Sequence, residues 1–346
     1  MKSKNLLLVL LLSTFLSCLQ EENFETGTDS ARLVVEGFIN DLDGGHIVKL
    51  TTLAELNGEG VNSLGRGADV QIQEIDGPRI SYTETTPGTY QIEPGILTGE
   101  VGKSYQLLIQ LSNGEEYIST IQTMQPPIGI ADGDAEFVRE FIENEDGTVR
   151  QDLSHNITVE IENQSNEHFF IVENRGWAEV EIGYDDCGFF DPPEAGPSTC
   201  WSIRDPIVTN QVVIGNNIGL SNENYEIPTL SVPFDAKGQF VALIRVNSMS
   251  AANYAFWERV NNQLNRSGGI FDRPIAPIIG NVVNTRTNES ALGYFHAYST
   301  SEQVICFDRS RISATLQIPG PIPCNLLCTD VWGPATFDNI SLIFCR

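Results

Sequence analysis

Residues 248–298, SMSAANYAFWERVNNQLNRSGGIFDRPIAPIIGNVVNTRTNESALGYFHAY, contain the most strongly helical pattern of the chain. Ser248 or Ser250 can cap the first turn by accepting a backbone N–H hydrogen bond, and Gly268-Gly269 ends the pattern. Apolar side chains recur at steps of three and four residues, at Tyr254, Trp257, Val260 and Leu264. The stretch predicts one helix near residues 250–266, with this stripe packed against a sheet.

Upstream of this helix, apolar residues recur with the period of two that indicates β-strands. Strands are expected at residues 33–39, 46–52, 68–75, 79–84, 89–92, 105–111 and 116–123, with turns such as Pro87-Gly88 and Asn113-Gly114 between them. Short strands separated by turn signals at this spacing predict an immunoglobulin-like β-sandwich over residues 32–125. Gln125-Pro126-Pro127 interrupts the strand pattern and marks the expected domain boundary.

Residues 126–346 are predicted to form a larger β domain around the helix. Its strands are expected at residues 135–143, 157–162, 168–182, 201–208, 211–214, 239–246, 290–298, 304–307 and 312–318. The expected fold is therefore mainly β. An N-terminal immunoglobulin-like β-sandwich is followed by a larger β-sandwich or barrel-like domain with one inserted α-helix.

The composition fits a folded, acidic protein. The chain has 346 residues, with 41% hydrophobic and 19% charged residues, and 20 basic residues against 46 acidic ones give a net charge of −26. This length is sufficient for two domains with their own cores. Because such a surface repels phosphate backbones, nucleic acid is not expected as a partner.

The N-terminus resembles a secretory signal. Lys2 and Lys4 precede an apolar run at residues 6–12, which is too short to serve as a stable membrane span. Cys18 follows Ser17 at the end of this segment, an arrangement similar to the lipobox of bacterial lipoproteins, in which the cysteine becomes the lipidated first residue. We expect residues 1–17 to be a signal peptide and Cys18 to carry the lipid, although Phe15 departs from the usual leucine and a plain signal peptide is the alternative.

Residues 18–31 are expected to form an acidic tether. Glu21 and Glu22 lie just behind Cys18, which resembles the surface-export signal of Bacteroidota lipoproteins; a solvated linker is the alternative. Asp29-Ser30-Ala31 matches a three-residue O-glycosylation sequon, so Ser30 is a candidate modification site.

Cysteine usage favours a compartment outside the cytoplasm. Without Cys18, six cysteines remain, namely Cys187, Cys200, Cys306, Cys324, Cys328 and Cys345. An even number in an exported chain predicts structural disulfides, and Cys187 with Cys200 would close a Gly- and Pro-rich loop. The close spacing of Cys324 and Cys328 is also compatible with zinc, but no second close pair or nearby histidine supports a metal site.

The sequence contains no recognisable catalytic motif. His46, His155, His168 and His296 are scattered and lack the spacing of metal ligands. Neither a nucleophile elbow nor a phosphate-binding loop is present. Asp41 and Asp43 before two glycines could hold Ca²⁺, but they lack the remaining ligands of a calcium loop and favour an acidic turn. No metal, cofactor or catalytic residue is predicted.

Several short motifs together resemble one family. They are Leu33-Val34-Val35-Glu36-Gly37, Gly67-Ala68-Asp69-Val70, Gly102-Lys103-Ser104-Tyr105, Cys200-Trp201, Tyr254, Phe256-Trp257, Gly269-Ile270-Phe271-Asp272, Pro274, Gly280-Asn281 and Leu292-Gly293-Tyr294-Phe295. Their order is similar to that of the Bacteroidota lipoproteins called domain of unknown function 4249. The resemblance implies an outer-membrane lipoprotein, often encoded beside TonB-dependent transporters, and it implies no activity and no catalytic residues.

The resulting hypothesis is a non-enzymatic lipoprotein held on the outer membrane by its lipid and facing the cell exterior. It would be an accessory or ligand-capturing partner of a TonB-dependent transporter or another outer-membrane barrel, in an outer-membrane protein complex. The expected contact surface comprises Phe189, Phe190, Trp201 and Trp257. A stand-alone glycan- or peptide-binding module is the alternative, and a hydrolase with dispersed carboxylates is a weaker one.

Overall fold

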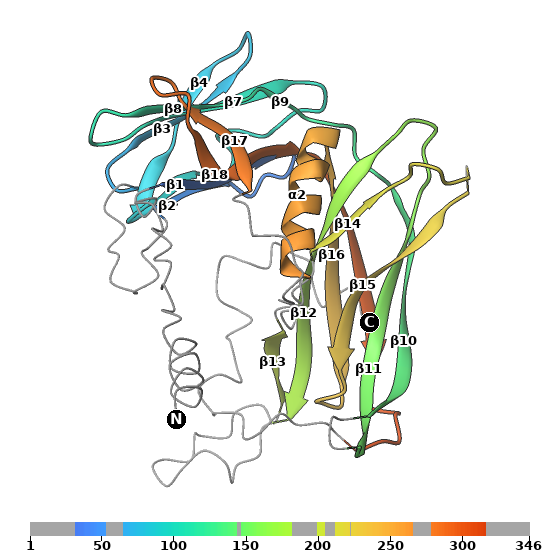
Figure 1. Cartoon of the computed structure of the whole chain (residues 1–346). Helices are drawn as coiled ribbons and strands as arrows, with labels where there is room; N and C mark the ends of the chain where they lie inside the picture. Colours follow the sequence, from blue (N-terminus) through green and yellow to red (C-terminus); the bar gives the residue numbers. More distant parts are fainter. Residues whose placement is uncertain are drawn as a thin grey trace, which may run out of the picture.

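The computed structural model describes residues 32–52, 65–143, 147–181, 199–204, 212–221, 223–265 and 278–315. The described chain is mainly β with one helix, α2 (Ala251–Leu264), and it forms two β bodies that meet beside this helix (Figure 1). The expectation of a mainly β chain with an inserted helix is confirmed. Within the described residues, no helix has the length and apolar character required to cross a membrane.

The first body is one large, nearly closed sheet. Its strand order is β4-β3-β7-β8-β17-β18-β1-β2-β6-β5, with β9 paired to β7. Since only Tyr82 separates β4 from β5, the two ends of this order lie on one continuous segment. The strands are β1 (Leu33–Asn40), β2 (His46–Thr52), β3 (Asp69–Glu74), β4 (Arg79–Ser81), β5 (Thr83–Thr86), β6 (Thr89–Ile92), β7 (Ser104–Gln110), β8 (Glu116–Ser119), β9 (Gln122–Thr123), β17 (Ile279–Asn284) and β18 (Ser290–Tyr298).

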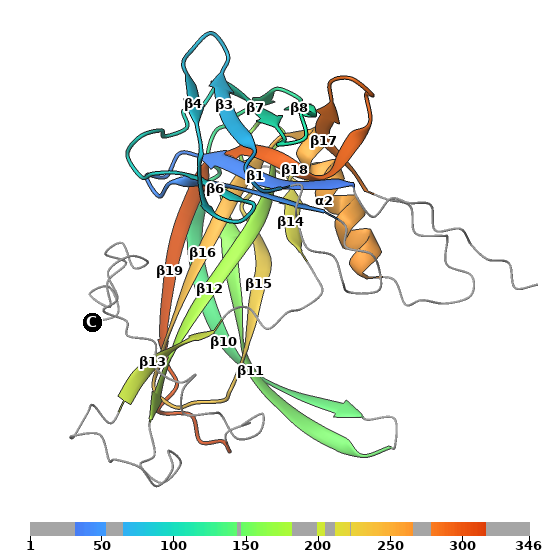
Figure 2. The same ribbon diagram turned by 90° about the vertical axis from the view of Figure 1, so that its left-hand side faces the viewer.

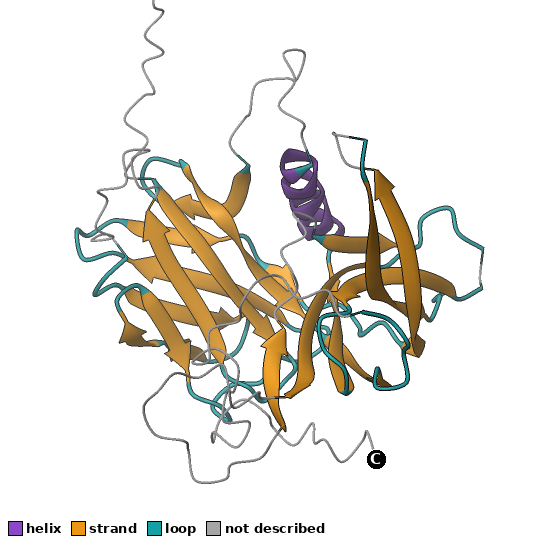
Figure 3. Ribbon diagram, turned by 90° about the horizontal axis from the view of Figure 1, so that it is seen from below, coloured by secondary structure: helices purple, strands orange, loops and turns teal. Residues whose placement is uncertain are grey.

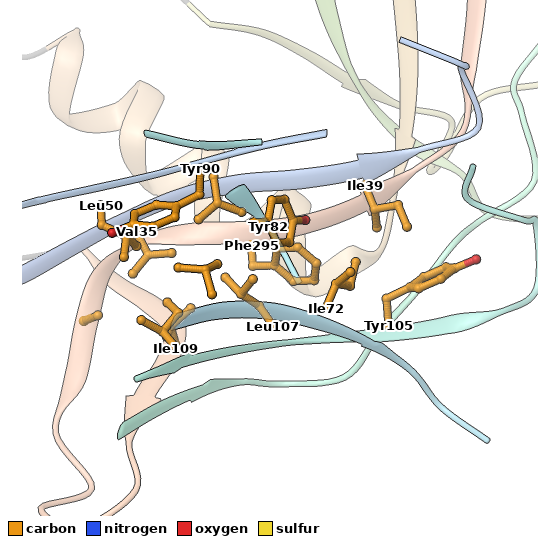
Figure 4. Packing of buried hydrophobic residues seen from close by; sticks show 14 of the residues in the cluster. Val35, Ile39, Leu50, Ile72, Tyr82, Tyr90, Tyr105, Leu107, Ile109 and Phe295 are labelled. Carbon is orange, nitrogen blue, oxygen red and sulfur yellow. The ribbon is translucent and has the colours of Figure 1, made fainter. Parts of the chain in front are cut away.

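The curled sheet encloses the first core. Alternate residues of β1 and β18, including Val35, Ile39 and Phe295, are fully buried and face the residues of β3 and β7. Figure 4 shows these side chains between the two halves of the sheet, with Ile72, Leu107 and Ile109 on the opposite side. The other residues of β1 and β18 therefore point away from this core, toward the second body.

The first body is built from two separate segments of sequence. Gln125, at the predicted domain boundary, lies where the chain leaves this body. Residues 279–298 nevertheless return to it, because β18 is hydrogen-bonded in parallel to β1 and β17 is antiparallel to β8. The first sheet thus extends beyond the predicted limits of 32–125.

The second body is a sandwich of two antiparallel sheets. One sheet contains β10 (Ile130–Glu143), β11 (Val149–Ile161) and β15 (Tyr225–Pro233). The other contains β12 (Phe169–Glu181), β13 (Thr199–Arg204), β14 (Val213–Asn216), β16 (Gln239–Met249) and β19 (Thr300–Asp308). Ile157 and Val159 of β11 pack against Phe240 and Ile244 of β16 in its core, and all four side chains are fully buried.

The two bodies are joined at a buried hydrogen-bond node. The hydroxyls of Ser248 and Ser299 lie 2.7 Å apart, and both donate to the carbonyl oxygen of Gln125, at 3.2 and 2.8 Å. Asp41 accepts a hydrogen bond from the backbone N–H of Thr300 at 2.9 Å. These hydrogen bonds connect the segments at which the chain passes from one body to the other. Asp41, considered above as a possible Ca²⁺ ligand, thus accepts a hydrogen bond from the backbone.

Candidate functional site

A cavity of about 420 Å³ lies where α2 meets both β bodies. Seen from below, the helix occupies the space between the two groups of strands (Figure 3). Rings from three elements line this space, which we call the aromatic cavity: Phe38 of β1, Phe256 and Trp257 of α2, and Tyr294, His296 and Tyr298 of β18. A volume of this size is typical of sites for small ligands.

The strand period explains one wall of the cavity. Successive side chains of a strand point to opposite faces, so the strands that bury Val35 and Phe295 in the first core present Phe38 and His296 on the other face. Phe38 is the register partner of His296 in the parallel pair β1–β18. The rings of Phe38 and Tyr298 are stacked, with centroids 5.5 Å apart.

The helix supplies the opposite wall. Ser250 caps it by accepting a hydrogen bond from the backbone N–H of Asn253, as one of the two predicted caps. Asn253, Phe256, Trp257 and Val260 lie on one side of the helix, since Asn253 and Trp257, and Phe256 and Val260, are four residues apart, and all four line the cavity.

The predicted apolar stripe of the helix is only partly correct. Trp257 and Val260 face the cavity, but Tyr254 packs against Phe169 of β12, with centroids 5.2 Å apart, and Leu264 is 45% exposed. The buried helix residues are instead Asn253 and Phe256. The stripe was misplaced because a hydropathy pattern ranks Asn253 as polar, whereas the crossing chains bury it.

Four rings form a continuous series from the helix to β18. Phe256 contacts Tyr294 with centroids 4.8 Å apart, and Tyr294 stacks on His296 at the same distance. Trp257 lies over His296 with centroids 5.8 Å apart and ring planes inclined by 16°. Since aromatic pairs stabilise each other beyond the area they bury, these contacts hold the cavity wall in place.

His296 is uncharged in this setting. Part of its side chain faces the cavity, but the surrounding protein removes water from the ring, and this desolvation lowers its pKa to about 3. At neutral pH the imidazole therefore offers one N–H donor and one nitrogen acceptor without adding positive charge.

A second hollow of similar volume lies on the outside of the first sheet. It is lined by residues of β3, β4, β7 and β8, among them Asp69, Gln71, Arg79 and Glu116. Among its described lining residues, Tyr117 alone contributes a ring. The aromatic cavity is the better candidate for a binding site because apolar walls with few polar groups are typical of such sites.

The comparison with protein families matches residues 21–304 to a domain of unknown function, DUF4249. This chain belongs to the DUF4249 family. A comparison with curated proteins finds no match. The match spans every element that lines the aromatic cavity, from β1 to β18.

Several of the motifs noted in the sequence lie at two places in the structure. Phe256, Trp257 and Tyr294 lie in the cavity wall. Gly280, Asn281 and Gly293 lie where the pairing of β17 with β18 is irregular. The side chain of Asn281 donates to the carbonyl oxygen of Phe295 at 2.9 Å and accepts a hydrogen bond from its backbone N–H at 2.8 Å. The motifs thus contribute to a ring-lined wall and to the strand junction that carries it.

Among the predicted contact residues, Trp257 lies in the cavity. The structure does not describe the other predicted contact residues, namely Phe189, Phe190 and the side chain of Trp201. The described residues also leave out most of the predicted modification and disulfide sites: Cys18, Ser30, Cys187, Cys324, Cys328, Cys345 and the side chain of Cys200. Cys306 of β19 is disulfide-bonded, and the connectivity of the predicted set stays a prediction.

The histidines are distributed over both bodies. His46 donates from Nε2 to the carbonyl oxygen of Leu97 at 2.8 Å, His155 stacks on Phe307, and His168 lies 2.9 Å from the hydroxyl of Tyr225. Within the described ranges, no group of three potential metal ligands is found.

Proposed function

We propose that this DUF4249 protein is a lipid-anchored, surface-exposed lipoprotein of the outer membrane that captures a small ligand in the aromatic cavity. It acts without catalysis, as an accessory of a TonB-dependent transporter or another outer-membrane barrel. The observation that carries the proposal is the cavity of about 420 Å³ between α2 and the two β bodies, with rings on both walls.

The proposed location is supported by the N-terminal sequence. Cys18 follows an apolar segment and precedes two acidic residues, Glu21 and Glu22, in the arrangement of an exported lipoprotein. The remaining six cysteines suit an oxidising compartment. A lipid anchor and a tether up to Ala31 would place the cavity at the cell surface.

A projecting ribbon is the proposed contact with the barrel partner. Strand β11 pairs with β15 only over Ser154–Ile161, so the ends of β10 and β11 near their turn pair only with each other. Figure 2 shows this hairpin extending beyond the sandwich. Phe141 and Val149 on the projecting part are 73% and 64% exposed and lie on the same face of the ribbon, which is the surface that we propose the partner covers.

Replacing Phe141 with aspartate is expected to release the partner without unfolding the protein. The full chain with an affinity tag is purified from its native membrane, and co-purifying proteins are identified. We expect an outer-membrane barrel with the unaltered chain and a reduction of at least about tenfold with Phe141→Asp, since one central aromatic contact commonly contributes 2 kcal/mol or more.

The matched control is Ile96→Asp, at a 58% exposed position of the first body, which should retain the partner. Absence of any barrel with the unaltered chain would contradict the accessory role. If the ligand were still captured in that case, the protein would be the stand-alone glycan- or peptide-binding module.

Replacing Trp257 with alanine is expected to abolish capture. The neutral dye N-phenyl-1-naphthylamine, whose fluorescence rises in apolar surroundings, serves as the probe. Trp257→Ala removes the largest ring of the wall and should weaken dye binding by about tenfold or more, because a buried aromatic contact contributes about 2 kcal/mol. Leu264→Ala, at the exposed end of the same helix, should bind the dye normally. Equal binding by both variants would place the dye elsewhere.

A further inference from the structure

The walls of the aromatic cavity select for a flat, apolar body. Its six rings are accompanied by Ile47, Ile171, Met249 and Val260, so most of the lining is carbon. A free sugar would exchange many hydrogen bonds with water for few in this cavity, which is unfavourable. An aromatic or branched apolar group forms no hydrogen bonds with water that it would lose on entering the cavity. Rings on both walls can also stack on it.

One buried acceptor in the wall lacks a donor. The side chain of Asn253 is 2% exposed and lines the cavity, and its Oδ1 has no hydrogen-bond partner among the described residues. A buried amide oxygen without a donor is unfavourable by about 1–3 kcal/mol. A ligand that brings an N–H group to this wall would remove that penalty.

Charge at the cavity is predominantly negative. Glu36 of β1 and Glu173 of β12 line it from the two bodies, together with one cation, Lys49 of β2. All three residues are exposed. The register partner of Glu173 is Arg245, but the Nε of Arg245 donates to Glu302 at 2.7 Å, so Arg245 is engaged on its other side. Within the described part of the chain, no ion pair within 4.0 Å joins Glu36 to Lys49 or Glu173 to Arg245.

The rings themselves favour positive charge. A cation over the face of a tryptophan, tyrosine or phenylalanine is attracted by the ring quadrupole. His296 adds no opposing charge because its imidazole is neutral. A ligand ammonium would thus meet two carboxylates, several ring faces and the acceptor of Asn253, and Lys49 is the cation among the described lining residues.

We infer that the aromatic cavity binds an amphipathic cation, a small ligand with a flat apolar body and one ammonium or guanidinium group. The inference rests on the proposed capture function and specifies its ligand class. The apolar body would lie between the helix wall and the β18 wall, and the cationic group would lie toward Glu36 and Glu173.

The test compares three probes that share an indole body: tryptamine, which is cationic; tryptophol, which is neutral; and indole-3-propionate, which is anionic. Binding to the mature chain with Cys18→Ser, which avoids lipid and detergent, is measured by calorimetry. We expect tryptamine to bind about tenfold more tightly than tryptophol, and the propionate to bind most weakly. The advantage of tryptamine should shrink as salt is raised, because exposed charges are screened.

Glu173→Gln separates charge from shape. It should reduce the advantage of tryptamine over tryptophol by about threefold or more. The matched control Glu226→Gln, at an exposed position of β15 in the other sheet, should leave all three affinities unchanged.

The outcomes distinguish the two proposals. If the three indoles bind equally, or the propionate binds most tightly, the ligand class is wrong while capture by the cavity stands. If neither the indoles nor N-phenyl-1-naphthylamine bind, the capture function fails and the inference fails with it.

Discussion

Replacing Gly293 with alanine is expected to unfold the first body under conditions in which the unaltered chain is stable. Gly293 has φ of +79°, in the left-handed region that L side chains rarely adopt. A Cβ placed there would lie 2.1 Å from the carbonyl oxygen of Val35, its register partner on β1. Backbone strain of about 1–3 kcal/mol is thus joined by a clash that neither strand can relieve, for a total above about 4 kcal/mol.

The measurement is urea unfolding, and the chain provides its own control. Gly219 has nearly the same φ, +78°, but a Cβ added there would have no neighbour within 4 Å. Gly219→Ala should lower the free energy of unfolding by only about 1–2 kcal/mol, which is the backbone cost alone. The difference between the two variants in the free energy of unfolding measures the cost of the clash with β1. Equal losses would mean that the β1–β18 pair shifts apart at little cost.

The same junction constrains β17. A Cβ on Gly280 would lie 1.9 Å from the carbonyl oxygen of Gly293, so the two paired strands leave no space for a side chain at this position. The ladder between β17 and β18 is irregular from Ile279 to Val283, and the side chain of Asn281 bridges this gap through its two hydrogen bonds to Phe295. A motif with two glycines and an asparagine is thus explained by backbone approach.

The local strands could be predicted from the sequence because one face of each strand is buried. In β1 and β7, buried residues alternate with more exposed ones, which is the pattern that identifies a strand. The turn at Asn113-Gly114 joins β7 and β8 as expected, and Gly114 has a φ of +86°. Such signals lie within a few residues of each other and need no information about distant partners.

The long-range pairings could not be predicted in this way. Arg32 donates to the carbonyl oxygen of Ser290, 258 residues away, and β1 and β18 pair beside this contact. A parallel pair leaves no turn signal between its strands. Strand β15 was also missed, because Pro228 and Pro233 interrupt its pattern; the structure places it at an edge of its sheet, with a register shift beside Pro228.

The cavity was accessible to sequence reasoning only in part. Trp257 can be predicted as a contact residue because it is a large ring on an amphipathic helix. Phe38 and His296 gave no signal of their own, since each looked like an ordinary strand residue. They line the cavity because β1 and β18 pair in parallel and turn the same face toward the helix.

Lowering the pH from 7 to 5 is expected to destabilise the fold strongly through its histidines. The pKa of each of the four histidines is lowered in the folded chain, chiefly because burial disfavours the charged ring. The values fall to about 4 for His155, which also lies near the Arg309 cation, and to about 3 for His296. Both rings therefore stay neutral at pH 5 in the folded state.

The sign follows from proton uptake. In the unfolded chain a histidine has a pKa near 6.5, so between pH 6.5 and 5 the unfolded state binds protons that the folded state does not. The free energy of unfolding is therefore highest above pH 6.5, where both states are neutral at these histidines. It decreases as the pH falls toward the pKa values of the folded state. Each histidine lowers the free energy of unfolding by about 1.4 kcal/mol for each pH unit below 6.5. Over the 1.5 pH units down to pH 5, the two histidines together lower it by about 4 kcal/mol.

Urea unfolding at pH 7 and pH 5 measures this loss, and His155→Gln tests its origin. His155 is 4% exposed and packs among Phe137, Phe234 and Phe307. Glutamine cannot titrate, so the variant, although less stable at pH 7, should lose only about half as much between the two pH values. Ile121→His, at a 53% exposed position of the first body, is the converse control and should leave the loss unchanged, because water reaches the new ring in both states. A stability that stays constant from pH 7 to pH 5 would mean that water reaches the rings of His155 and His296 in the folded protein.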